Sequence, residues 1–282
     1  MKRFISNKMK IKNFSYTACR SFLVFVITFL TIQTRGFSSN QKDGYEQILR
    51  SFSEFYHKNH VALQVKINEA DPSISASADF DGTTYSITVN RALLNSNRIT
   101  ADGLRIILCH EAGHLFGGAP RKSAPPEWDG SLAPDGRSWM SAEAQSDYYA
   151  GAVCFRKFVR FENSQFEPIT LDEKNEFEFA YANCLAVWKN SADARLCARA
   201  SVGASNFLKL TWDFNISLQT PSVERPDSSI IETYPSRQCR LDTVFNGARC
   251  RSELPLIWNL NDSAINDCPD ENFARNRCWY VE

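Results

Sequence analysis

Two of the four histidines in this sequence lie four residues apart, in the stretch HEAGH at positions 110–114. Apolar residues recur around them at helical spacing, and residues four apart on a helix share one face, so His110 and His114 can bind a single metal ion. Glu111 then lies beside the ion without binding it, where a carboxylate can take a proton from a zinc-bound water. The pattern predicts a zinc site with Glu111 as the general base. One alternative is a core helix that contains the HEAGH motif by chance. The other is a structural or inactive zinc site, although a purely structural site would gain nothing from Glu111.

A catalytic zinc site needs a third protein ligand and one open position. The scheme HExxHxxGxxH is matched as far as its glycine, but a proline stands where its last histidine would be, and no histidine follows His114. The third ligand is therefore expected to be an acid. Glu143 is favoured, because Asp147 lies four residues later on the same predicted helix and can accept a hydrogen bond from a ligand histidine. Glu127, in the loop sequence PPEWDG, competes with it but would have to be ordered at an additional entropic cost.

The surrounding chain predicts the elements that must position these residues. The alternating stretch TTYSITVN, residues 83–90, predicts a half-buried strand. Thr100 or Asp102 can cap the helix that carries HEAGH, and Gly117 can end it. The other expected elements are a helix entering a strand within 43–70, a loop at 119–140, helices from Ser141 to about 161, over 172–189 and over 192–209, and a linker at 219–229.

HEAGH on one helix and EAQSD at the start of the next resemble the gluzincin metallopeptidases. Over about residues 80–280 the chain is similar to secreted bacterial metallopeptidases with HExGHxxGGxP, a segment like SAEAQSDYYA and a cysteine-bearing tail like QCRLDTVFNGARC. The resemblance implies an α+β, zincin-like fold with a mostly helical core, a small sheet next to the active-site helix and a short disulfide-bearing C-terminal segment. It also implies that residues 83–90 form an edge strand, which could pair with an extended peptide.

The sequence departs from better studied gluzincins in one respect. No histidine downstream of the motif is present to stabilise the oxyanion of a tetrahedral intermediate. A tyrosine or an arginine would have to do so. The candidates are Tyr148, Tyr149, Tyr181, Arg195 and Arg199, each of which could equally be a packing or surface residue.

The N-terminus has the pattern of an export signal. The first 42 residues contain no acid, and six basic residues precede the apolar run at 22–32. This run is about half the ~20 apolar residues that a membrane-spanning helix needs, which favours a cleaved signal peptide over an anchor. We therefore expect an exported protein, periplasmic or extracellular, with no stable membrane span after cleavage. The expected division is a signal peptide at 1–36, an N-terminal helix and strands at 37–100, a zinc-binding helical core at 101–210 and a cysteine-containing segment at 211–282.

Nine cysteines are present, and Cys19 would leave with the signal peptide. The eight that remain form an even set in an exported chain, which indicates disulfides, although spacing alone does not choose the pairing. Cys109 is interpreted as a buried thiol or half of a disulfide, because one helical step turns it about 100° from the ligand face. Short loops favour the pairs Cys239 with Cys250 and Cys268 with Cys278, and Cys184 with Cys197 is one plausible pair among several.

The hydrophobic content and the net charge of the chain exclude some classes of function. Hydrophobic residues make up 43% of the 282 residues, which is enough for a substantial core. The formal net charge is zero, and loss of the basic signal would leave a mildly acidic protein, so nucleic acid is not an expected partner. The interpretation is a secreted zinc-dependent metallopeptidase-like hydrolase with one zinc ion per chain and a peptide or protein substrate. The alternatives are a non-catalytic binding protein of the cell envelope on a zincin scaffold, and a cell-wall amidase.

Overall fold

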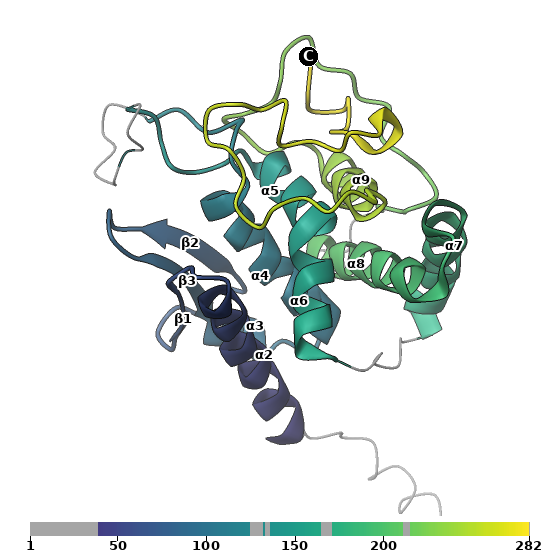
Figure 1. Cartoon of the computed structure of the whole chain (residues 1–282). Coiled ribbons are helices and arrows are strands. Elements are labelled where there is room, and N and C mark those ends of the chain that lie inside the picture. Colours follow the sequence, from purple (N-terminus) through teal and green to yellow (C-terminus); the bar gives the residue numbers. More distant parts are fainter. Residues whose placement is uncertain (1–38, 125–131, 133–135, 165–170, 211–214, 282) are drawn as a thin grey trace, which may run out of the picture. The chain divides into compact units, whose positions relative to one another are not determined.

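The computed structural model describes residues 39–124, 132, 136–164, 171–210 and 215–281 (Figure 1). The expected signal peptide, Cys19 and the alternative ligand Glu127 lie outside these described residues. The chain divides into the units Met1–Gln41 and Lys42–Glu282, and the described helices and strands belong to the second unit, apart from the first turn of one helix. In the described ranges no helix is both long enough and apolar enough to cross a membrane.

This unit combines helices with one small sheet, so the expected mixture of helices and strands is confirmed. The expected strand at 83–90 and the expected helices at 172–189 and 192–209 are present within one or two residues of their predicted bounds. In chain order the elements are α2 (Ser39–Lys58), β1 (Leu63–Asn68), β2 (Ala76–Phe80), β3 (Tyr85–Asn90), α3 (Arg91–Leu94), α4 (Ala101–Phe116), α5 (Glu143–Tyr149), the π-helical turn η1 (Ala150–Cys154), α6 (Phe155–Glu162), α7 (Leu171–Trp188), α8 (Ser191–Lys209), α9 (Arg237–Ala248) and the 3-10 turn η2 (Glu271–Phe273).

The sheet has the strand order β1-β3-β2, with β1 parallel and β2 antiparallel to β3. The expectation that residues 83–90 form an edge strand is therefore wrong, because β3 is the central strand. Leu63–Asn68 and Ala76–Phe80 each pair with β3 along one of its edges, a long-range arrangement that the alternating pattern of 83–90 does not specify. The short strand β2, with the sequence ASADF, occupies the edge beside α4 instead.

Helix α4, which carries HEAGH, is buried on all sides rather than along one stripe. Every residue from Ala101 to Phe116 is buried except Asp102, because α4 packs against the sheet as well as against α5 and α8 (Figure 1). Thr100 caps its start by accepting a hydrogen bond from the backbone N–H of Gly103, and Gly117 is its C-cap, as expected. These caps define the two ends of the helix, and the packing around it orients its side chains.

Gly113 sets the distance between α4 and α5. A Cβ atom at this position would lie 2.7 Å from both the Cα and the carbonyl oxygen of Ser146, which is too close for any real contact. The helices can approach this closely only because position 113 has no side chain. This approach brings the HEAGH face against the start of α5, where Glu143 lies.

We expect Gly113→Ala to lower the free energy of unfolding by about 1–3 kcal/mol and to weaken metal binding, because α5 must move away and carry Glu143 with it. Urea unfolding of the metal-free protein and a zinc titration measure the two effects. Gly44→Ala is the matched control, since nothing lies within 4 Å of a Cβ at that helical position. Equal stability of the Gly113 variant and the parent would contradict this role.

The helix expected from Ser141 begins two residues later, at Glu143, and Ser141 is not its N-cap. The hydroxyl of Ser141 donates to the carbonyl oxygen of Gly118 at 2.8 Å, and its backbone pairs with the segment after α4. Ser141 therefore ties the end of α4 to the approach of α5. The helix then passes through η1 before it continues as α6.

Four disulfides join all eight expected cysteines, and the pair Cys184–Cys197 is confirmed. The pairs Cys239–Cys250 and Cys268–Cys278 are wrong. Cys239 lies in α9 and Cys250 lies two residues after its end. The helix rises by about 13 Å from Cys239 to Ala248, far beyond the reach of a disulfide. The other bonds are Cys109–Cys154, which ties α4 to η1, and Cys239–Cys278 and Cys250–Cys268, which fasten the C-terminal segment to α9.

Candidate metal centre

Helices α4 and α5 bring His110, His114 and Glu143 together. Atom Oε2 of Glu143 lies 3.4 Å from Nε2 of His110 and 3.6 Å from Nε2 of His114. One donor atom from each residue lies within 4.8 Å of the other two, and all three side chains are buried. The two histidines lie one turn apart on α4, and the close contact at Gly113 supplies the carboxylate from α5. These residues form a buried group that could bind a metal ion.

The two oxygens of Glu143 have different surroundings. Oε1 accepts a hydrogen bond from Nζ of Lys122 at 2.7 Å. Oε2 is fully buried and accepts no hydrogen bond from the described residues, since its contacts with the two imidazoles are too long. A buried carboxylate oxygen without a partner is costly, and a cation bound between it and the two Nε2 atoms would remove that cost. The donor set therefore fits a divalent metal ion.

Asp147 lies behind His110, on the side away from Glu143. Its Oδ1 is 2.8 Å from Nδ1 of His110, although the ring N–H is not aligned for a good hydrogen bond. Arg240, from the first turn of α9, donates to both oxygens of Asp147, with Nε to Oδ2 at 2.7 Å and Nη2 to Oδ1 at 3.0 Å. The buried carboxylate is thus held in place and turns Nε2 of His110 towards Glu143.

His114 is oriented by the backbone instead. Its Nδ1 lies 2.9 Å from the carbonyl oxygen of Ser141 and 3.0 Å from the hydroxyl of Ser146. A carbonyl oxygen only accepts hydrogen bonds, so Nδ1 must carry the hydrogen. Nε2 of His114 then keeps its lone pair, which faces the carboxylate and is available to a metal ion.

The carboxylates and imidazoles of the centre shift one another's pKa values towards the charged forms. Burial disfavours the charged form of His110, but the nearby carboxylates of Asp147 and Glu143 outweigh burial and raise its pKa to about 9. Burial opposes ionisation of Glu143 as well, yet its contacts with His110 and His114 hold its pKa far below the usual range. The carboxylates are therefore ionised, and protons on the histidines compete with a metal ion for the same nitrogen atoms.

Glu111 is not part of the donor group but borders the same pocket, a cavity of about 420 Å³ that opens to solvent. It is buried, with 8% of its surface exposed. The residues Ile74 to Ala78, in and just before the edge strand β2, form one wall of the pocket. The pocket is also lined by Lys122 and by three residues near the start of α9, namely Tyr234, Arg237 and Arg240. The pocket gives a ligand access to the donor group and to Glu111 together.

The oxyanion candidates named from the sequence do not line this pocket. Tyr148 donates to the carbonyl oxygen of Phe273 and Tyr149 to that of Leu256, both within the core. Arg199 pairs with Asp102 at 2.8 Å. Tyr234 borders the pocket instead, and its pKa is raised to about 12, first by burial and then by the charge of Glu143. Nothing in the local sequence distinguished Tyr234 or Arg240, because they reach the site only through the packing of the C-terminal segment.

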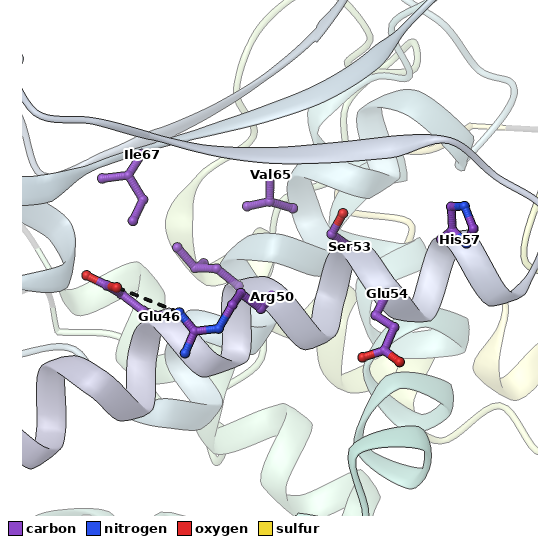
Figure 2. A pocket seen from close by; sticks show the side chains of 8 residues that line it. Glu46, Arg50, Ser53, Glu54, His57, Val65 and Ile67 are labelled. Atoms are coloured by element: carbon purple, nitrogen blue, oxygen red, sulfur yellow. Dashed lines mark ion pairs between the residues drawn. The ribbon is translucent and has the colours of Figure 1, made fainter.

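A second pocket, of about 480 Å³, lies between α2 and β1 (Figure 2). Arg50 and Glu46 form an ion pair in it at 3.8 Å, and Val65 and Ile67 line its sheet side. His57 is exposed there. This pocket is slightly larger than the first, but none of the metal-donor residues line it. The pocket beside His110, His114 and Glu143 is therefore the candidate functional site.

Comparisons of the chain with protein-family models, with curated proteins and with solved structures found no match in any of the three.

Proposed function

We propose that this chain is an exported zinc-dependent peptidase with a gluzincin-type site on a zincin-like fold. The observation that carries the proposal is the buried group of His110, His114 and Glu143, next to Glu111 in an open pocket. One oxygen of Glu143 accepts no hydrogen bond from the described residues. Two histidines, one glutamate and an accessible fourth position are typical of hydrolytic zinc sites. The four disulfides are compatible with export.

In this proposal each residue of the site has a separate task. Zinc held by His110, His114 and Glu143 would supply a Lewis acid and a water of lowered pKa. Glu111 is not needed as a ligand, so it accepts the proton of the attacking water and returns it to the leaving amine nitrogen. The hydroxyl of Tyr234 borders the same pocket and, like any tyrosine hydroxyl at neutral pH, carries its proton, so it can donate a hydrogen bond to the developing oxyanion.

The edge strand β2 is a suitable platform for a peptide. Its described hydrogen-bonded neighbour is β3 alone, and residues Ile74 to Ala78 border the pocket that contains Glu111. An extended peptide can add to such an edge through its backbone groups, which fix its direction and bring one bond to the catalytic group. This assigns to β2 the role that the sequence suggested for residues 83–90.

The test is to incubate the purified mature protein with a diverse peptide pool, and separately with crosslinked cell-wall peptides, and to identify new termini by mass spectrometry. We expect cleavage of ordinary peptide bonds that a chelator stops and added zinc restores. Cleavage confined to the wall material would favour the amidase alternative. Zinc-loaded protein that produces no new terminus in either material would favour a binding protein and contradict the proposal.

A further inference from the structure

The pocket beside the metal-donor group contains more cationic than anionic side chains. Lys122, Arg237 and Arg240 border it together with the acids Glu111 and Glu143. Asp147 lies behind Arg240 and is fully buried. A divalent ion in the donor group would add two further positive charges. The pocket would then have an excess of positive charge, which a ligand with a negative group would balance.

Arg240 has hydrogen-bonding capacity left for such a ligand. Its Nε and Nη2 atoms are used by Asp147, but Nη1 makes no hydrogen bond to any described residue. The guanidinium group packs against the rings of Phe207 and Tyr234, with each centroid 5.4 Å from Cζ, and its two hydrogen bonds to Asp147 orient its plane. The residue is only 7% exposed, yet it borders the pocket. Two N–H groups of an almost buried cation are therefore available at the pocket wall.

Lys122 and Arg237 extend the same wall. The Nζ atom of Lys122 has three N–H groups, of which Glu143 takes one, and it lies 5.6 Å from the centre of the Tyr234 ring. Arg237 is one helical turn before Arg240 on α9, and it donates to the carbonyl oxygen of Leu208. Burial and the charge of Arg240 lower the pKa of Arg237, so a negative group placed beside both guanidinium groups would favour their charged forms.

The residues in and just before β2 that line the pocket carry no negative charge. Residues 74–78, with the sequence ISASA, are small or apolar and include no acid. A bound peptide would thus meet a neutral strand edge and three cationic side chains in the same pocket.

We propose that Lys122, Arg237 and Arg240 bind a carboxylate group of the substrate beside the scissile bond, so that the site prefers peptides with an aspartate, a glutamate or a free C-terminus at that position. This inference rests on the proposed function. Carboxylate is the chemistry that the geometry selects, because a planar guanidinium edge and an ammonium group can both donate to its two oxygens.

Binding measurements on the Glu111→Gln variant loaded with zinc test this without turnover. The probes are octapeptides of glycine and alanine in which one glutamate, or one glutamine, is moved along the chain, each made with a free and with an amidated C-terminus. By calorimetry we expect at least one glutamate peptide, or the free-acid series, to bind about tenfold or more tightly than its neutral partner. Tighter binding of a glutamate peptide would identify a site for an acidic side chain. Tighter binding of the free-acid series would identify a carboxypeptidase-like site for the C-terminus.

Equal affinity of charged and neutral peptides at every position and at both termini would overturn the inference. If the parent enzyme cleaves peptides but this equality holds, the proposed function stands and the carboxylate site does not. If charged peptides bind preferentially but no peptide is cleaved, the carboxylate site stands and the peptidase does not.

A pair of variants then locates the site. Lys122→Gln and Arg237→Gln, both measured at saturating zinc, are expected to reduce the charged-to-neutral affinity ratio severalfold. Lys157→Gln is the matched control, because Lys157 is also a partly exposed lysine that faces a glutamate, Glu253 at 3.4 Å, but lies outside the pocket. An unchanged ratio in both pocket variants, or the same loss in the control, would show that these cationic side chains are not the binding site.

Discussion

Replacing Glu143 by alanine is expected to weaken zinc binding by more than the ~10- to 100-fold that loss of a partner behind a ligand usually costs. The reason is that Glu143 supplies the only carboxylate oxygen that faces both Nε2 atoms among the described residues, and two imidazoles alone hold zinc poorly. Titration of the metal-free protein with zinc, against a chelator of known affinity, measures the change.

Two further variants test whether Glu143, rather than Glu127, is the third zinc ligand. Asp147→Asn should weaken binding by roughly 10- to 100-fold, since the amide keeps its shape but loses the charge that holds His110 and Arg240. Glu127→Ala should leave the affinity nearly unchanged. The opposite order, with Glu127 as the residue whose loss releases zinc, would remove Glu143 from the site and leave only the HEAGH histidines in it.

The second large effect concerns the reaction rather than the metal. Glu111→Gln should retain zinc at the parent affinity and lower the rate of peptide hydrolysis by about 10²- to 10⁴-fold, because the amide fills the same space and cannot accept a proton. Both quantities are measured on one preparation, as metal content and as cleavage of a peptide found in the pool experiment.

The matched control is Glu54→Gln, the same chemical change on α2 beside the second pocket, which should leave the rate unchanged. A Glu111 variant that hydrolyses peptides at the parent rate would exclude Glu111 as the base. A variant that loses zinc as well as activity would place Glu111 among the residues that hold the metal, and the division of tasks proposed for the site would fail.

The donor residues were predictable from the sequence because their arrangement is local. HEAGH positions two imidazoles by helical periodicity alone, and EAQSD places Glu143 and Asp147 one turn apart at the start of the next long helix. The predicted bounds of most helices and of the strand at 83–90 were also close to those observed, since apolar periodicity and caps such as Thr100 act over a few residues.

The disulfides and the position of the edge strand were not predictable in this way. The pairing of Cys239 depends on α9 being a helix, which carries Cys250 away from it and leaves Cys278 beside it. Whether residues 83–90 are central or at an edge depends on β1 and β2 taking both sides of the strand, and strand order is decided by packing over long sequence separations.

By itself, then, the sequence determined which residues could bind a metal and which acid could serve as a base, because helix geometry relates residues a few positions apart. Only the tertiary structure decided what surrounds them. The absence of a side chain at Gly113 lets α5 approach α4. Helix α9, which the disulfide Cys239–Cys278 joins to the last residues of the chain, brings Arg240 to Asp147 across 93 residues of sequence. Tyr234 and Arg237 reach the pocket with it. Such contacts depend on the packing of distant segments, which leaves no periodic pattern in the sequence.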